Sequence, residues 1–226
     1  MTADGSTGTG IDYARLYDFR FRRISDASRS AVWNEIAPYL AERLGSPERV
    51  LDAAAGRGEF INAVPASERW AVDMVDSPHL RRDPGVRTVI GNILEAELPE
   101  GHFDLIFASN LLEHFPSQEV VGTFLAQMRA LLAPGGRIAV LGPNFRYCAR
   151  EYFNCADHTL ALTHTSVEEH VYAAGFIVDD VVPKFLPFSF RGRLPAGPRL
   201  VRGYLRFRPA WHVLGKQFLV VGHRDH

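Results

Sequence analysis

The stretch "VLDAAAGRGEF", from Val50 to Phe60, decides the fold. It has the pattern of a short buried strand that runs into a glycine loop and then into a helix. Gly56 and Gly58 bracket Arg57 at this turn, and glycine lets a backbone pass close to a ligand. A single GxG is common in tight turns, so the loop alone does not identify a ligand. It predicts a nucleotide-like ligand only if the neighbouring strands supply further contacts.

Strands alternate with helices along most of the chain, which predicts an α/β fold with a doubly wound sheet and helices on both faces. A first helix is expected before Gly45, because apolar residues from Val32 to Leu44 recur at helical spacing. Two further helices are expected over 117–136, closed by a Pro-Gly-Gly turn, and over 165–176, capped by Thr165 or Ser166 with Glu168 or Glu169. Strands are expected at 49–55, 69–75, 86–93, 103–110, 137–144, 176–185 and 216–224.

Residues 1–10 are predicted to be a flexible tail, and 11–226 to form one domain. Segments 146–163 and 186–211 show no regular pattern, and we expect both on the acceptor side of the site. Residues from about 11 to 30 are expected to act as an N-terminal lid.

The charge balance excludes a whole-protein attraction to nucleic acid, because 25 basic residues face 26 acidic ones. The spacing of Cys148 and Cys155 fits neither a redox pair nor a zinc knuckle, so we expect a reduced cytoplasmic protein. No apolar run approaches the ~20 residues that span a bilayer. Contact with a membrane surface stays open, and the sequence leaves the oligomeric state open.

Polar residues follow the predicted strands at the edge of the sheet where doubly wound folds bind ligands. Asp52 ends the first strand, where it can accept bonds from loop amides or from a cationic amino group. Asp73 ends the second, at the place where an acidic side chain meets a ribose diol. Asn92 and the pair Ser109-Asn110 follow the third and fourth strands.

NAD is the obvious alternative ligand, but its fingerprint needs a third glycine where this chain has Ile61. No P-loop Lys-Ser/Thr pair follows the glycines either. The loop therefore favours a ligand without a phosphate chain. S-adenosylmethionine, which combines adenine, ribose and an amino-acid tail, is such a ligand.

At this point the chain resembles a known family. "VLDAAAGRGEF", "AVDMVD", "GNILEAELPEGHFDLIFASNLLEHFPS" and "LLAPGGRIAVLGPN" look like the successive motifs of class I Rossmann-like S-adenosylmethionine-dependent methyltransferases, over about residues 30–185. The remainder resembles a small bacterial branch of that superfamily of mostly unassigned substrate, including roles in secondary metabolite biosynthesis. The resemblance implies a seven-stranded sheet with the last strand antiparallel. It also implies cofactor contacts from Asp52, Ala53, Ala54, Gly56, Gly58, Phe60, Asp73, Met74, Asn92, Ile93, Ser109, Asn110 and Leu111.

Two positions depart from the family pattern. Members usually have glycine where this chain has Ala54, and often aspartate where it has Asn92. The methyl group of Ala54 costs little if its φ is negative and more if φ is positive. Asn92 can still accept a hydrogen bond from an adenine amino group through its amide oxygen.

Four residues are candidates for catalysis. His114 follows the fourth strand and either faces the methyl group or fixes the loop. Asn144 either orients the acceptor or caps a turn. His158 and His164 lie near Asp157, which can orient a histidine base, or they serve as structural hydrogen-bond partners. We expect no metal, because His158, His164 and His170 lack the usual ligand spacing.

The acceptor is expected to contact residues in three segments that are rich in arginine and tyrosine. The segment from Arg191 to Arg208 is either a solvated basic face or a surface for an anionic substrate or membrane. The candidate substrate-binding residues are Tyr17, Arg20, Arg22, Arg146, Tyr147, Arg191 and Arg193.

The sequence thus favours an S-adenosylmethionine-dependent methyltransferase that acts on a small polar or anionic metabolite such as a sugar, nucleoside or secondary metabolite. One alternative is an enzyme of the same fold that catalyses coupling or cyclisation, and another is a non-catalytic partner that only binds the cofactor.

Overall fold

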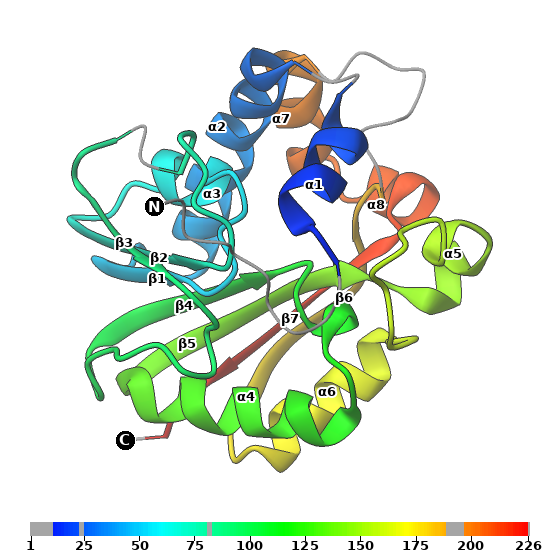
Figure 1. Cartoon of the computed structure of the whole chain (residues 1–226). Helices are drawn as coiled ribbons and strands as arrows, with labels where there is room; N and C mark the ends of the chain where they lie inside the picture. Colours follow the sequence, from blue (N-terminus) through cyan, green and yellow to red (C-terminus); the bar gives the residue numbers. More distant parts are fainter. Residues whose placement is uncertain (1–10, 23–24, 81–82, 189–196, 226) are drawn as a thin grey trace.

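Seven strands form one sheet in the computed structural model, which describes residues 11–22, 25–80, 83–188 and 197–225. The strand order is β3-β2-β1-β4-β5-β7-β6 (Figure 1). Strands β1 to β5 pair in parallel, whereas β7 pairs antiparallel with both β5 and β6. The bounds are β1 Arg49–Asp52, β2 Glu68–Asp73, β3 Val86–Ile90, β4 Phe103–Ser109, β5 Leu132–Pro143, β6 Ile177–Leu186 and β7 Gln217–His223. The predicted sheet, with its last strand antiparallel, is confirmed.

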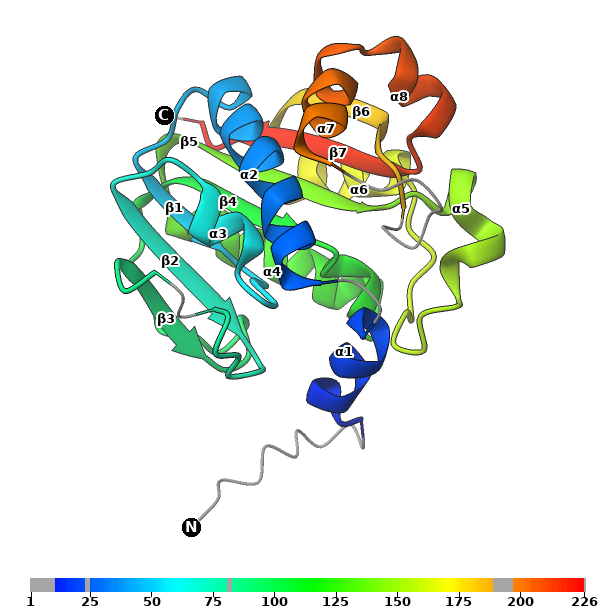
Figure 2. The same ribbon diagram turned by 90° about the horizontal axis from the view of Figure 1, so that it is seen from above.

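Helices cover both faces of the sheet, as Figures 1 and 2 show. One face packs against α2 (Asp26–Arg43), α3 (Glu59–Ala63), α7 (Pro198–Arg206) and α8 (Pro209–Leu214). The other packs against α4 (Gln118–Leu131) and α6 (His164–Ala173). The helices α1 (Tyr13–Phe21) and α5 (Phe145–Tyr152) lie beyond the carboxyl ends of the strands. The short 3-10 helix η1 (Leu112–His114) follows β4.

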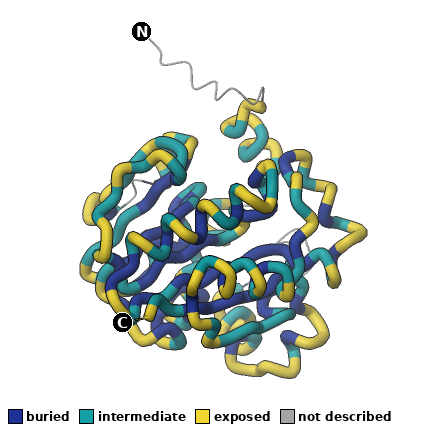
Figure 3. Tube along the Cα trace, turned by 90° about the horizontal axis from the view of Figure 1, so that it is seen from below, coloured by how far each residue is buried: buried dark blue, intermediate teal, exposed yellow. Residues whose placement is uncertain are grey.

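The sheet separates two apolar cores, and its central strands are buried by both (Figure 3). In β4, Leu105 and Phe107 face the core that holds α2, whereas Ile106 and Ala108 face the core that holds α4. This alternation explains why β4 reads as an uninterrupted apolar run. Because β1, β2 and β4 are parallel, their last residues reach one edge of the sheet together.

Two segments that we expected to be irregular contain helices. Segment 146–163 begins with α5, which Asn144 caps by accepting a bond from the Arg146 amide. Segment 186–211 contains α7 and the first half of α8, each of which begins with a proline at its first position. These helices are only about two turns long, and such short segments offer too few turns for a helical pattern to be recognised with ease.

Two predicted helix ends are also wrong by a few residues. Helix α6 is capped by Thr163, whose hydroxyl accepts from the Ser166 amide, and not by Thr165 or Ser166. Helix α4 ends at Leu131, and the Pro-Gly-Gly turn belongs to the start of β5, where the pairing with β4 shifts register. A left-handed Gly135 allows that shift.

Within the described ranges, no helix has both the length and the apolar character that a membrane span requires. The predicted tail over 1–10 lies outside the described residues.

Candidate active site

One cavity of about 850 Å³ opens at the carboxyl edge of the sheet, over the ends of β1, β2 and β4. At one end it is lined by the glycine loop, including Asp52, Gly56 and Asp73. At the other end it is lined by ionisable side chains of η1 and of the loop after α5, including His114 and His158.

Asp73 closes the glycine loop onto the end of β2. Its Oδ2 accepts a bond from the Gly56 amide at 2.6 Å, and its Oδ1 accepts from the Val75 amide at 2.9 Å. Gly56 has a φ of 57°, a left-handed conformation that favours glycine. Burial raises the pKa of Asp73 above its usual range. The carboxylate thus shapes the loop and lines the cavity, where it retains lone pairs for a ribose diol.

Asp52 is 2% exposed, and its Oδ1 is buried without a hydrogen-bond partner in the part of the chain that the structure describes. Burial and the neighbouring Asp73 raise its pKa well above the usual value. A buried carboxylate oxygen without a donor is costly, and a cationic or N–H group in the cavity would satisfy it. The amino group of an amino-acid tail is such a group, so this residue fits S-adenosylmethionine.

The remaining cofactor candidates line the same end of the cavity, with one exception. Asn92 uses its Oδ1 to accept from the Leu94 amide at 3.1 Å, which leaves one lone pair for a ligand. Gly58 does not line the cavity among the described residues. It begins α3 at a φ of 73°, and a Cβ there would meet Asn62 and Leu80 at 3.0 Å or less, so its role is to shape the turn. The residues that do line it are Asp52, Ala53, Ala54, Gly56, Phe60, Asp73, Met74, Asn92, Ile93, Ser109, Asn110 and Leu111.

Asn110 is one of two non-glycine residues with positive φ in the described ranges, at 50°. Its side-chain Oδ1 accepts a hydrogen bond from the Gln217 side chain at 2.8 Å, and its backbone N–H donates to the Leu141 carbonyl at 2.8 Å. These bonds hold a strained residue at the edge of the cavity, where such strain is commonly found. Ala54 is not among the positive-φ residues, so its methyl group imposes no backbone strain.

Asp157 pairs with His114, and not with His158 as the sequence suggested. The His114 Nδ1 donates to the Asp157 carbonyl at 2.9 Å and lies 3.5 Å from the Asp157 carboxylate. The same carboxylate forms an ion pair with Arg20 of α1. Arg20, His114 and Asp157 therefore form a connected polar wall at the far end of the cavity.

Glu113 is a site residue that the sequence reasoning missed. It is 2% exposed, lines the cavity beside His158, and has a pKa raised by burial. Burial also lowers the pKa of His158 to about 4, so that imidazole is neutral at pH 7. The available signal was an acidic residue inside the apolar run "NLLEHF", because such a residue is rarely buried without a function.

The substrate candidates are distributed unevenly. Tyr17 and Arg20 of α1 line the cavity, and burial together with the charge of Asp73 raises the pKa of the Tyr17 hydroxyl. Arg22 is exposed and stacks on Phe19 at 4.1 Å, outside the cavity lining. Arg191 and Arg193 lie outside the described residues.

The other two catalytic candidates have structural partners instead. The Asn144 side chain is fully buried, and its Nδ2 donates to His164 Nδ1 and to the Pro183 carbonyl, each at 2.9 Å. Neither residue lines the cavity, and the same holds for Arg146 and Tyr147. The Tyr147 ring stacks on the His164 ring, with 6.3 Å between their centroids. Arg146 and Tyr147 belong to α5, and Asn144 is its N-cap, so these residues gather at the start of α5 and outside the cavity.

The expectation of no metal rested on His158, His164 and His170, and the structure separates these three. His164 bonds to Asn144, and His170 bonds to Gln118 on α4 at 2.7 Å. His158 instead lies beside Glu113 and His114. The spacing argument therefore addressed the wrong set of residues.

Comparison with known proteins identifies the family of this chain. A family model described as a methyltransferase domain matches residues 25–171. One similar protein is a probable nonribosomal peptide synthetase, CymA, of Salinispora arenicola, which is 31% identical over 128 residues. The match covers 48% of this chain and 2% of that synthetase, so the chain spans a small part of the length of this relative.

Three solved structures illustrate the similarity of fold. A SAM-dependent methyltransferase from Archaeoglobus fulgidus has a TM-score of 0.64 and 18% identity, covering 94% of this chain and 100% of that chain. The 1,6-didemethyltoxoflavin N1-methyltransferase of Burkholderia thailandensis, with its bound substrate and S-adenosylhomocysteine, has a TM-score of 0.57 and 22% identity, covering 95% and 89%. The [4+2]-cyclase SpnF has a TM-score of 0.59 and 17% identity, covering 85% and 80%.

Proposed function

Because this chain belongs to the methyltransferase domain family, we propose that it is an S-adenosylmethionine-dependent methyltransferase that acts on a small polar metabolite. The acceptor binds at the end of the cavity formed by His114, His158 and Asp157. The glycine loop and Asp52, at the other end, hold the cofactor.

The observation that carries this proposal is the single cavity with two chemically different ends. Its volume of about 850 Å³ is near the upper end of the ~300–1,000 Å³ typical of small-molecule sites. The cavity thus has room for a cofactor and a second small molecule side by side. A macromolecular acceptor would insert only one base or one side chain into the cavity. A nucleic acid acceptor is not supported, because the overall charge of the chain is close to neutral.

The charges in the cavity support a polar acceptor over a strongly anionic one. Arg20 pairs with Asp157, and Arg29 pairs with Glu59 at 2.6 Å. Lys216 pairs with Glu151 at 2.7 Å. These basic side chains are already neutralised by carboxylates within the protein, so hydroxyl, amide or ring nitrogen groups match the wall better than a phosphate does.

The contribution of the protein to the reaction is mainly position and exclusion of water. S-adenosylmethionine, when bound, supplies an electrophilic methyl group on its sulfonium. Helix α1 covers the cavity with Tyr13, Tyr17 and Arg20, while His114 and His158 present imidazole nitrogens to the acceptor. These groups can hold the acceptor atom in line with the methyl group.

A labelled-methyl assay tests the proposal. The protein is incubated with S-adenosylmethionine carrying a radioactive methyl group and with a panel of sugars, nucleosides and hydroxylated secondary metabolites. We expect labelled product and an equal amount of S-adenosylhomocysteine for at least one acceptor, and neither from Asp52→Asn. Absence of S-adenosylmethionine binding in calorimetry would overturn the proposal.

A second function remains an outcome of the same assay. SpnF shares this fold and is a cyclase, and this chain has Ala54 where glycine is usual. Conversion of a panel compound without release of S-adenosylhomocysteine would identify a coupling or cyclising enzyme. We place the reaction in the cytoplasm, since neither Cys148 nor Cys155 forms a disulfide among the described residues.

A further inference from the structure

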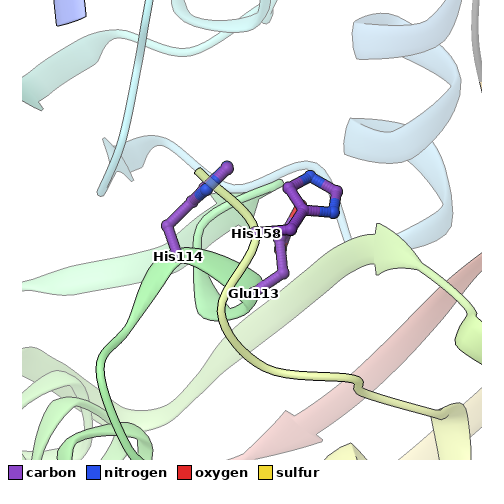
Figure 4. Close-up of side chains that lie close together, drawn as sticks. All are labelled: Glu113, His114 and His158. Carbon is purple, nitrogen blue, oxygen red and sulfur yellow. The ribbon is translucent and has the colours of Figure 1, made fainter. Parts of the chain in front are cut away.

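Three potential metal ligands meet at the acceptor end of the cavity. Glu113, His114 and His158 each offer one ligand atom, and these atoms lie within 4.8 Å of one another. Figure 4 shows Glu113 and His114 on the turn after β4 and His158 approaching from the loop after α5, with the three side chains grouped together. All three residues line the cavity.

Two atoms of this group are buried without a partner in the described parts of the chain. They are Glu113 Oε1 and His158 Nδ1. A buried carboxylate oxygen and a buried imidazole nitrogen without hydrogen bonds each cost stability, so native structures rarely keep them without a function. The two side chains do not bond to each other, although their ligand atoms are neighbours. A shared cation would satisfy both atoms at once.

The backbone holds the group in place before any ligand arrives. The Glu113 carbonyl accepts bonds from the amides of Thr159 and Leu160 at 2.8 and 3.1 Å, which fixes the His158 loop against η1. The Thr159 hydroxyl bonds to the same carbonyl at 3.0 Å. His114 donates through Nδ1 to the Asp157 carbonyl, which leaves its Nε2 for a ligand. Metal-bound histidines usually have their other nitrogen oriented by such a bond.

We propose that Glu113, His114 and His158 bind a divalent transition-metal cation at the acceptor end of the cavity. Two imidazoles and one carboxylate suit Zn²⁺, Co²⁺, Mn²⁺ or Fe²⁺ better than Mg²⁺ or Ca²⁺, which prefer oxygen ligands. Ligands about 2.1 Å from a tetrahedral ion are roughly 3.4 Å apart, so small side-chain rotations close the site. Glu113 and Asp157 bring two carboxyl groups to this end of the cavity, beside the single guanidinium of Arg20.

The role of the cation rests on the proposed methyl transfer, whereas its binding does not. Three protein ligands leave at least one position open, and it faces the cavity. An acceptor hydroxyl bound there would lose its proton to solvent more easily, because the cation stabilises the oxygen anion. That oxygen then forms the new bond to the methyl carbon, and the sulfur keeps the electron pair of the carbon–sulfur bond that breaks. The inferred acceptor group is therefore a hydroxyl.

Cobalt binding tests the site without any acceptor. The full chain is freed of metal with a chelator, dialysed, and titrated with Co²⁺ while visible absorption and heat are recorded. We expect one equivalent to bind with visible bands, and Zn²⁺ to displace it. Glu113→Gln and His158→Ala are expected to weaken Co²⁺ binding at least tenfold. His170→Gln, a histidine outside the cavity lining, is the matched control and should bind like the wild type.

The possible outcomes separate two questions, namely whether the three residues bind the cation and whether the cation assists methyl transfer. Unchanged Co²⁺ affinity in both ligand variants, or no binding to the wild type, overturns the site. Calorimetry with S-adenosylmethionine is run on the same variants and should give wild-type affinity, which shows that they fold. If methyl transfer proceeds fully after chelation, the inferred role fails while the proposed methyltransferase function stands. If the wild type binds Co²⁺ but not S-adenosylmethionine, the proposed function fails and the site stands.

Discussion

Asp73 both shapes the glycine loop and faces the cofactor end of the cavity, so its removal should affect binding in two ways. We expect Asp73→Ala to weaken S-adenosylmethionine binding by about 1.5–3 kcal/mol, the range for hydrogen bonds to a charged group. Titration calorimetry measures this change. Asp76→Ala, an exposed carboxylate on the same loop, is the control. Affinity of Asp73→Ala within twofold of the wild type would remove this residue from the site.

The buried carboxylate of Asp52 should lower the free energy of unfolding when no cofactor is bound. Burial raises its folded pKa above the unfolded value near ~3.9, so the ionised form is disfavoured in the folded state. The cost is absent below the unfolded pKa and grows as pH rises towards the folded pKa. We therefore expect Asp52→Asn to raise the free energy of unfolding by about 1–3 kcal/mol at pH 8 and by little at pH 4. Urea unfolding at both pH values checks this, and an equal gain at both would contradict it.

Ala54 occupies a position where glycine is usual in the family, yet its φ is not positive. Replacement by glycine should thus relieve no strain and add freedom to the unfolded chain. We expect Ala54→Gly to lower stability by about 0.4–1 kcal/mol and to leave cofactor affinity within a few-fold. Thermal melting and calorimetry on the same sample measure both. A stabilised variant would show that the backbone at this position is strained after all.

At the scale of elements, α1 is held over the cavity by one buried ion pair, from Arg20 to Asp157. Arg20→Gln leaves the Asp157 carboxylate without its cation, so α1 should open more often. We expect amide hydrogen exchange over Tyr13–Phe21 to become about tenfold faster or more. Arg22→Gln, at the exposed C-cap of the same helix, should leave exchange unchanged. Equal exchange in both variants would mean that other contacts dock α1.

The elements also show what sequence reasoning can reach. All seven strands were predicted, because each is rich in apolar residues. Several of the parallel strands are also followed by a polar residue at their carboxyl end, as β4 is by Asn110. The short helix α5 was missed because only its cap, Asn144, and its aromatic contacts define it. Most of the residues proposed to contact the cofactor could be placed at the cavity from the sequence, since they end or closely follow strands β1, β2, β3 and β4.

The acceptor end was harder to predict because its contacts join distant parts of the chain. Arg20 and Asp157 are 137 residues apart, and Glu113 lies near His158 because the following residues, Thr159 and Leu160, bond to the Glu113 carbonyl. A pairing between residues so far apart leaves no pattern of spacing in the sequence that would predict it. The expected dyad of Asp157 with His158 failed for this reason, since adjacent residues on an extended loop point in different directions.

At the scale of the whole molecule, the two cores share one sheet and should unfold together. Trp33 packs against the core that holds α2, whereas Trp70 packs against the core that holds α4. Trp211, the third tryptophan of the chain, is buried in the core that holds α2 and is replaced in both variants. Variants that then keep either Trp33 or Trp70 report on one core each. We expect their urea midpoints by fluorescence to agree with each other and with circular dichroism. Midpoints that differ beyond the effect of the substitutions would show that the cores unfold separately.

The position of β7 between β5 and β6 has a consequence for synthesis on the ribosome. Strand β7 pairs with both β5 and β6, and about thirty residues separate the end of β6 from the start of β7. At roughly 5–20 residues per second, translation of this interval takes about 2–6 s. During that time the nascent chain exposes one open edge of β5 and the whole of β6, and open strand edges promote aggregation. Ribosome pausing within residues 187–216 would therefore prolong the interval in which this protein most needs a chaperone.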